Sequence, residues 1–227
     1  EQLRQIGVRS PQIVLEPVRR DSAAAVAVAT ELALARDPGA IVGVIAADHV
    51  VQDGSLFVET CRQAGLVARQ GRIVTIGIPP TSPATGYGYI ETGEGLGNGA
   101  HAVRRFVEKP DRDRAAAMLE SGGYLWNSGM FMLPVDLFLR ELQQYAPEVL
   151  AAASEAVAKA HHDLDFERLD EAAFARPGEL GVGRPGDDGA ADAVAADAHR
   201  SDAGVDLERL DLRRIEVGQR RVHVVGA

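Results

Sequence analysis

A carboxylate and an imidazole stand directly after an apolar run, at a place where ligands often bind in α/β proteins. Asp48 and His49 follow the run Ile41–Ala46. In open α/β sheets, ligands bind beyond the carboxyl ends of the strands. A carboxylate at that edge can hold Mg²⁺, which prefers one or two carboxylates together with phosphate oxygens. An ordinary Asp-His turn after a strand is the alternative, and the local pattern alone favours it.

A second polar group ends the strand expected at Val103–Val107. Neighbouring residues of a strand point to opposite faces, so Glu108 and Lys109 can enter one pocket only where the strand ends, as Pro110 indicates. Only two of the 24 basic residues are lysines, Lys109 and Lys159. A lysine in so arginine-rich a chain indicates that a compact ammonium group is needed, for example against a phosphate. An exposed Glu/Lys pair that contributes little stability is the alternative.

Glycines and an amide mark two further candidate segments. Gly86, Tyr87 and Gly88 form a Gly-Tyr-Gly sequence, in which the backbone could approach a ligand closely. A plain entry from a loop into a strand explains the same residues. Asn127 stands between large apolar residues, where its amide must find partners in the backbone or in the hydroxyls of a bound sugar. A tight turn that places Trp126 in the core is an equally good interpretation.

A polar turn precedes the first long helix, which is expected from Asp21 or Ser22 to about Arg36. The free N–H groups of a helix N-terminus can meet an anion or the edge of a base. Glu16, Arg20, Asp21 and Ser22 are therefore candidate nucleotide contacts. Capping of the helix by Asp21 or Ser22 is the simpler interpretation, and we prefer it on the sequence alone.

The elements that must position these residues alternate between β-branched runs and Ala/Leu-rich runs. This alternation is typical of an α/β fold with a mixed, mostly parallel sheet flanked by helices. The run 41–46 is apolar throughout, as expected for a strand buried on both faces. Strands are predicted at 13–15, 41–46, 72–78, 87–91, 103–107 and 125–133, and helices at about 21–36, 55–69, 111–121, 135–145 and 147–161.

Composition limits the classes of protein that need to be considered. The 227 residues are 46% hydrophobic and 25% charged, as in a folded globular chain, and the formal charge is −9. That charge argues against a broad nucleic-acid surface, which needs a basic footprint. The single cysteine, Cys61, excludes an internal disulfide and indicates a reducing compartment. No apolar run reaches the length of a membrane helix, no His/Cys spacing indicates zinc, and we expect a cytoplasmic protein.

The last 51 residues differ from the rest of the chain. Residues 177–227 contain no Phe, Trp, Tyr or Lys and are rich in Gly, Ala, Asp and Arg. We therefore divide the chain into a core at 1–176 and an atypical tail at 177–227. One interpretation is a polar, disordered linker that ends in a strand at 221–225. The other is a shifted reading frame, because GC-rich DNA read out of frame yields these residue types.

Taken in order, the candidate segments resemble the bacterial mannose-1-phosphate guanylyltransferases. The resemblance covers about residues 1–175, and the Ala-Asp-His-Val step at 47–50 is its most specific part. It rests on the sequences Leu-Glu-Pro at 15–17, Arg-Asp-Ser-Ala at 20–23, Ala-Asp-His-Val at 47–50, Gly-Tyr-Gly-Tyr-Ile-Glu at 86–91, Phe-Val-Glu-Lys-Pro at 106–110 and Trp-Asn-Ser-Gly-Met-Phe at 126–131.

The resemblance implies a Rossmann-like nucleotidyltransferase fold, incomplete at its N-terminus, and a role in polysaccharide biosynthesis. The family joins GTP and mannose-1-phosphate into GDP-mannose with Mg²⁺ and releases pyrophosphate. By this resemblance Asp48 is a metal ligand and catalytic, and Lys109 binds the sugar phosphate and is catalytic. Glu108 and Asn127 hold mannose hydroxyls, the turn of Gly86, Tyr87 and Gly88 lines the sugar site, and the Arg20-Asp21-Ser22 turn lies near guanine.

This sequence departs from the family pattern at three places. Asp21-Ser22-Ala23-Ala24 stands where the family has Asn-Thr-Ala-Pro. The glycine-rich motif that grips the triphosphate would precede Glu1, and the Trp-Ser-Asp-Val-Gly-Ser-Trp segment with a second metal carboxylate is missing after Trp126. We therefore expect these 227 residues to bind nucleotide poorly and to be inactive. A nucleotidyltransferase for another sugar-1-phosphate and a non-catalytic sugar-phosphate-binding relative are the alternatives. Whether the protein forms a homo-oligomer, and whether the full-length protein carries a fused isomerase domain, is left open.

Overall fold

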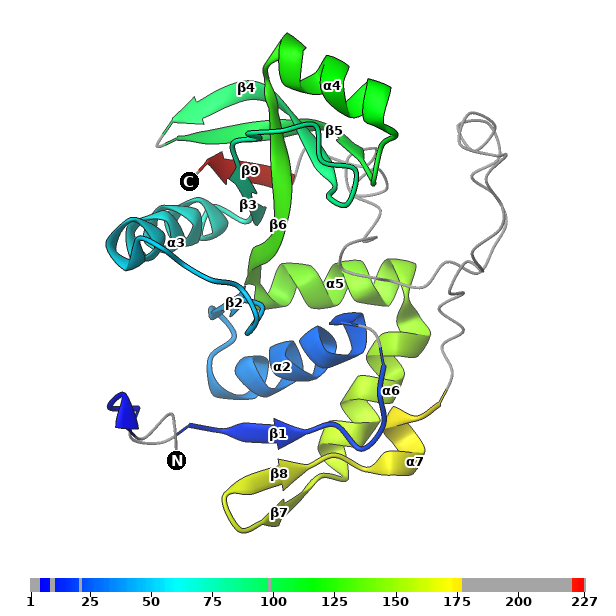
Figure 1. The fold of residues 1–227 in the computed structure, drawn as a ribbon. Coiled ribbons are helices and arrows are strands. Elements are labelled where there is room, and N and C mark those ends of the chain that lie inside the picture. Colours follow the sequence, from blue (N-terminus) through cyan, green and yellow to red (C-terminus); the bar gives the residue numbers. More distant parts are fainter. Residues whose placement is uncertain (1–4, 9–10, 21, 98, 177–221, 227) are drawn as a thin grey trace. The chain divides into compact units, whose positions relative to one another are not determined.

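Two compact units make up the chain in the computed structural model, which describes residues 5–8, 11–20, 22–97, 99–176 and 222–226 (Figure 1). One unit draws on residues 1–31 and 142–206, and the other on residues 32–141 and 207–227. The division falls within helices α2 (Ser22–Arg36) and α5 (Val135–Tyr145).

A six-stranded sheet forms the centre of the second unit. Its strands lie in the order β2-β6-β3-β9-β5-β4. The long strand β6 also pairs with β4, so the pairings run in a closed circuit from β6 through β3, β9 and β5 to β4. The strands are β2 (Ile41–Val44), β3 (Ile73–Ile78), β4 (Tyr89–Gly97), β5 (Ala100–Val107), β6 (Tyr124–Pro134) and β9 (Val222–Gly226).

The mixed sheet flanked by helices is confirmed, but its strands are not mostly parallel. Only β3 and β9 pair in parallel in the described part of this sheet, and the other pairs are antiparallel. The unit β2-α3-β3 is a crossover between two strands of the same direction. β6 lies between them and runs against both, while β4 and β5 form a hairpin. The alternation of strands and helices therefore predicts that β2 and β3 run in the same direction, but not that β6 lies between them.

Two helices cover parts of this sheet, and both begin at an aspartate. The N–H of Leu56 donates to Asp53 Oδ1 at 2.9 Å at the start of α3 (Gly54–Ala68), and the N–H of Arg114 donates to Asp111 Oδ1 at 2.8 Å at the start of α4 (Arg112–Ser121). These contacts satisfy backbone donors that a helix end leaves free. α3 packs Ala64, Val67 and Ala68 against Val74 and Met132, and α4 packs Ala115 and Met118 against Tyr89 and Val107.

Strand β2 is shorter and less buried than its apolar sequence predicts. It ends at Val44 rather than Ala46, and Ile41, Val42 and Val44 are only half-buried, while Gly43 is exposed. The reason is its place in the sheet, because β2 is an edge strand that pairs only with β6 in the described residues. Burial on both faces was therefore a wrong prediction.

The first unit holds a separate three-stranded sheet. β1 (Ile13–Leu15) pairs in parallel with β8 (Phe166–Arg168), which pairs antiparallel with β7 (His161–Asp163). Helix α6 (Pro147–Ala158) is joined to the first part of α2 by the hydroxyl of Ser154, which donates to Glu31 Oε1 at 2.6 Å. The predicted helix 147–161 is thus shorter, since residues 161–163 belong to β7. The short helix α7 (Glu171–Phe174) follows β8.

The strand predicted at 221–225 is confirmed as β9. It lies between β3 and β5, parallel to the former and antiparallel to the latter. The proposed boundary at residue 176, and the choice between a genuine and a shifted reading frame, stay predictions. Residues 177–221 lie outside the described part of the chain. Where the chain is described, none of its helices combines the length and the apolar character of a membrane span.

Candidate functional site

The Gly-Tyr-Gly turn lies against the end of β5. The register pairs Tyr89, the first residue of β4, with Val107, the last residue of β5. A Cβ atom placed on Gly88 would lie 2.4 Å from Cζ of Phe106 and 2.9 Å from Oε2 of Glu108. The Phe106 ring and the Glu108 carboxylate therefore occupy the space that a Cβ atom at this position would need, and only glycine fits there. Gly86 is different, since a Cβ on it would meet no atom within 4 Å.

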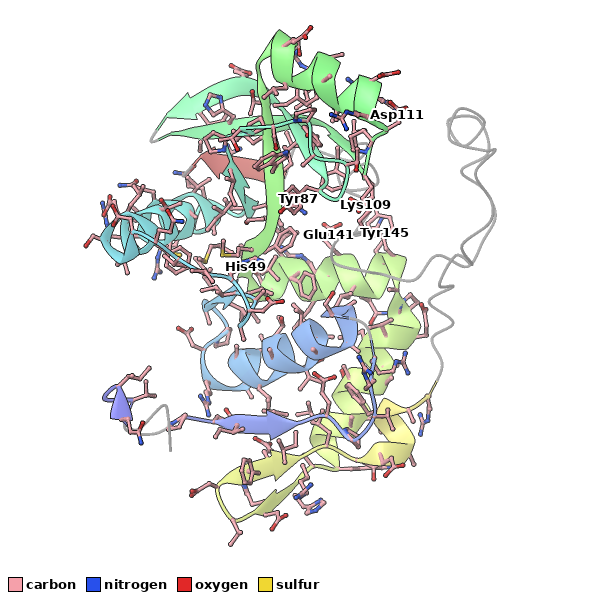
Figure 2. The ribbon with its side chains drawn as sticks, in the orientation of Figure 1. His49, Tyr87, Lys109, Asp111, Glu141 and Tyr145 are labelled. Carbon is pink, nitrogen blue, oxygen red and sulfur yellow. The ribbon has the colours of Figure 1, made fainter. Side chains whose placement is uncertain are left out.

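Lys109 adopts a backbone conformation that is rare for a side-chain-bearing residue. Its φ is 39°, in the left-handed region, and it precedes Pro110, which makes most conformations other than extended ones costly. Its Nζ lies 3.4 Å from Glu108 Oε1, and 57% of its side chain is exposed. Strained backbone of this kind often occurs at ligand sites. Figure 2 labels Lys109 and Tyr87, one from the segment after β5 and the other from the segment before β4.

Asn127 is held at a bulge in β6. Thr75 pairs with Phe131 and Gly77 pairs with Asn127. Two steps along β3 therefore oppose four along β6, and Gly129 takes a φ of 71° within the bulge. Bulges redirect side chains and often lie beside active sites. The short polar run Asn-Ser-Gly explains why the bulge forms here, because such residues bond their own backbone two positions on.

The amide of Asn127 is partly satisfied by the protein itself. Its Oδ1 accepts a bond from the N–H of Gly129 at 3.2 Å and one from the hydroxyl of Thr75 at 3.0 Å. Its backbone N–H donates to the carbonyl of Gly88 at 2.8 Å. That last bond ties the sugar-binding candidates of β6 and of the Gly-Tyr-Gly turn together. Within the described ranges, Asn127 Nδ2 has no hydrogen-bond partner.

An aromatic group supports the same turn. The ring centroids of Tyr87 and Trp126 lie 5.1 Å apart, and those of Tyr89 and Trp126 lie 6.5 Å apart in an edge-to-face arrangement. The hydroxyl of buried Tyr89 donates to the carbonyl of Ala84 at 2.9 Å. Tyr87 is 52% exposed, whereas Trp126 is half-buried and its Nε1 is buried without a hydrogen-bond partner among the residues described. Tyr87 is thus an exposed aromatic surface on a fixed base.

Asp48 lies in an exposed turn after β2. Since β2 and β3 both run against β6, their carboxyl ends point toward the part of β6 that contains Asn127. In the described parts of the chain, no group of three or more His, Cys, Asp and Glu residues could hold a metal ion. Asp48 therefore offers a single carboxylate, which fits Mg²⁺ only with waters and phosphate oxygens completing its shell.

The nucleotide-binding candidates lie in the other unit. Nη1 of Arg20 donates to the carbonyls of Phe174 at 3.1 Å and of Arg176 at 2.5 Å, at the end of α7. Glu16 and Ser22 are exposed, and Asp21 lies outside the described residues. The structure thus brings Gly88, Glu108, Lys109 and Asn127 together, while a shared site with the Arg20 turn stays a prediction.

Two residues of the site were not predicted from the sequence. Thr75 holds the Asn127 amide, and the ring of Phe106 lies against Gly88. Thr75 carried a signal, because it is a buried polar residue in the otherwise apolar strand Ile73–Ile78. Phe106 carried none, since an apolar residue near the end of a strand is ordinary.

Comparison with known proteins agrees with this fold. The family model of the nucleotidyl transferases matches residues 1–196. The chain therefore belongs to the nucleotidyl transferase family.

Two curated relatives and one solved structure show which members of this family the chain is similar to. A mannose-1-phosphate guanylyltransferase of Sinorhizobium fredii is 45% identical over 183 residues, which are 80% of this chain and 36% of that protein. The xanthan biosynthesis protein XanB of Xanthomonas campestris pv. campestris is 41% identical over 225 residues, 98% of this chain and 48% of that protein. A crystal structure from Thermus thermophilus, described as a mannose-1-phosphate geranyltransferase, has a TM-score of 0.69 and 26% identity over 99% of this chain and 55% of that one. The chain thus spans less than half the length of these two curated relatives.

Proposed function

We propose that the chain contains the sugar-phosphate site of an enzyme that transfers a guanylyl group from GTP to mannose-1-phosphate, giving GDP-mannose and pyrophosphate. The contact of Gly88 with Glu108, together with the bond from Asn127 to Gly88, carries this proposal. A carboxylate, an ammonium group and an amide thereby meet at one end of the sheet. Such a set suits a ligand that has both hydroxyls and a phosphate.

Each side chain has a role in the proposed site. Glu108 accepts hydrogen bonds from sugar hydroxyls, and Asn127 Nδ2 donates to a sugar oxygen. The Tyr87 ring, half-exposed and supported by Trp126, covers the apolar edge of the sugar. Lys109 binds the phosphate as a compact positive charge, and its left-handed backbone directs it away from the regular course of β5.

The reaction needs charge and position more than a protein nucleophile. A phosphate oxygen of mannose-1-phosphate forms a bond to the α-phosphorus of GTP, and the bond between that phosphorus and the bridging oxygen breaks, which releases pyrophosphate. Because two polyanions must meet, Lys109 lowers their repulsion and holds the attacking phosphate in line. Asp48 would hold Mg²⁺, which supplies positive charge to the triphosphate.

The nucleotide side of the proposal is carried by Glu16, Arg20, Asp21 and Ser22, which lie before or at the start of α2, because a helix N-terminus can meet an anion or the edge of a base. Arg20 also donates to two carbonyls of the chain, so a contact with guanine would have to be compatible with these hydrogen bonds. A cytoplasmic location and a role in polysaccharide precursor supply belong to the same proposal.

Titration calorimetry with mannose-1-phosphate tests the sugar site on the chain as it stands. We expect Glu108→Gln, which keeps an acceptor but loses its charge, to weaken binding, because hydrogen bonds to charged groups are worth about 1.5–3 kcal/mol against about 0.5–1.5 kcal/mol for neutral ones. Asn127→Ala removes both amide donors and should weaken binding about three- to tenfold, the range of one ordinary hydrogen bond. Glu94→Gln, in the distal part of β4, is the matched control and should bind as the parent does. Equal affinity in all four proteins would reject the site. Glucose-1-phosphate bound more tightly than mannose-1-phosphate would instead indicate a relative for another sugar.

A further inference from the structure

A buried hydroxyl lies behind the candidate sugar site. Thr75, in the middle of β3, has no exposed surface, although the rest of this strand is apolar or glycine. Its Oγ1 lies 3.0 Å from Oδ1 of Asn127 and 3.2 Å from the carbonyl oxygen of Met130. Burying a polar group in a core strand costs stability unless the group makes hydrogen bonds. The two contacts of the Thr75 hydroxyl therefore offset the cost of its burial.

The hydrogen bonds define which way the Asn127 amide faces. A backbone N–H can only donate, so the bond from Gly129 identifies its acceptor as Oδ1 and not Nδ2. The Thr75 hydroxyl has one proton, and the shorter of its two contacts is to this same oxygen. A rotated amide would set Nδ2 against the Gly129 N–H, donor against donor. The Gly129 N–H therefore excludes the rotated form, and the Thr75 hydroxyl adds a second hydrogen bond to the oxygen that Gly129 identifies.

We propose that Thr75 is a positioning residue that locks the Asn127 amide with its nitrogen toward the ligand, so that the site accepts only a hydrogen-bond acceptor at this point. The inference rests on the proposed function and deepens it. With Oδ1 bonded twice, Nδ2 keeps its two N–H donors, since it has no partner in the described part of the protein. A sugar hydroxyl or carbonyl oxygen satisfies these donors, whereas the ammonium of an amino sugar cannot.

The first test needs no ligand and measures whether Thr75 holds the Asn127 amide in place. In ¹⁵N-labelled protein, the Asn127 side-chain NH₂ signals are assigned by their absence from Asn127→Ala. We expect a rigid NH₂ group in the parent, a mobile one in Thr75→Val, which keeps the shape but removes the hydroxyl, and a rigid one again in Thr75→Ser. Equal ¹⁵N relaxation of this group in the parent and in Thr75→Val would overturn the proposal, whether or not any sugar binds.

A titration with mannose-1-phosphate then tests the consequence. We expect Thr75→Val to weaken binding about three- to tenfold, the range of one ordinary hydrogen bond, and Thr75→Ser to restore it. In an Asn127→Asp background, which keeps the acceptor oxygen but loses both donors, Thr75→Val should weaken binding no further. A second loss of the same size in that background, or no rescue by serine, would show a merely structural role. If the parent binds no mannose-1-phosphate while the NH₂ group behaves as expected, the proposed function is wrong, and the positioning of the Asn127 amide by Thr75 is still supported.

Discussion

Replacement of Gly88 by alanine tests the contact on which the candidate site depends. The new methyl carbon would lie 2.4 Å from Cζ of Phe106 and 2.9 Å from Oε2 of Glu108, whereas carbon atoms in contact are normally about 3.5–4.0 Å apart. The Glu108 carboxylate is half-exposed and can swing away, but the Phe106 ring is 8% exposed and cannot. Either the ring or the β4 backbone must shift.

The expected cost follows from that clash. Overpacking of a well-packed site costs about 1–3 kcal/mol, which for a chain of this size lowers the midpoint of thermal unfolding by about 2–4 °C per kcal/mol. The displaced Glu108 should also weaken binding of mannose-1-phosphate by tenfold or more. Urea denaturation measures the first effect, and calorimetric titration measures the second.

Gly86→Ala is the matched control, two residues away in the same turn. A methyl group there meets no atom within 4 Å, and the backbone of Gly86 is not in the left-handed region. We expect its free energy of unfolding to stay within about 0.5 kcal/mol of the parent value or to rise slightly, because alanine restricts the unfolded chain. If Gly88→Ala unfolds and binds as Gly86→Ala does, the close approach of Gly88 to Glu108 is wrong.

Three further changes separate charge, backbone strain and hydrogen bonding. Lys109→Gly relieves a left-handed backbone, so its free energy of unfolding in urea should be unchanged or up to about 1 kcal/mol higher. Its affinity for a sugar phosphate should fall, because the ammonium group is lost. A less stable variant would contradict the backbone strain. Asn127→Asp keeps the acceptor for Thr75 but replaces the amide donors, so it should stay folded by circular dichroism and lose mannose-1-phosphate affinity at neutral pH. Hydrogen bonds from Arg176 and then Lys159 lower the pKa of Glu155 from 4.5 to about 2. The stability that these hydrogen bonds contribute is therefore present above about pH 4.5 and lost as the pH falls toward 2. Glu155→Gln should therefore lose less free energy of unfolding than the parent across this pH range. The same pH dependence in both proteins would refute the pairing.

Local signals in the sequence predicted the elements well, because the residues that start and stop them act on their neighbours. Asp53 and Asp111 cap α3 and α4, and Gly71, whose φ lies in the left-handed region, stands shortly after the end of α3. Pro134 and Pro147 stand where α5 and α6 begin. Propensity and capping involve contacts a few residues apart, which a single sequence displays directly.

Strand neighbours were predicted less well, because pairing joins residues that are far apart in the chain. Nothing local to Ile41–Val44 shows that β6, some ninety residues later, lies between it and β3. The apolar run of β2 was therefore interpreted as a buried central strand, although it lies at the edge. The short β1 likewise pairs with β8 rather than with the main sheet.

The candidate site shows the same division between local and distant information. The sequence singled out Gly88, Glu108 and Asn127 separately as candidate site residues, from their residue types and their positions in an element. Each also had an alternative explanation that involves structure alone. Their closeness follows from the register of β4 with β5 and β6, which the sequence does not show. For Asn127, the backbone of Gly129 is one partner of the amide, through Oδ1, while Nδ2 has no partner within the described ranges. A contact of this residue with a sugar hydroxyl stays a prediction.

The measurement that most directly tests the proposed sugar-phosphate site is a map of backbone amide shifts in ¹⁵N-labelled protein titrated with mannose-1-phosphate. The account predicts saturable shifts at Gly86, Gly88, Glu108, Lys109 and Asn127, and much smaller shifts with inorganic phosphate alone. Saturable shifts confined to other residues, or no shifts at millimolar sugar phosphate in the folded chain, would contradict it.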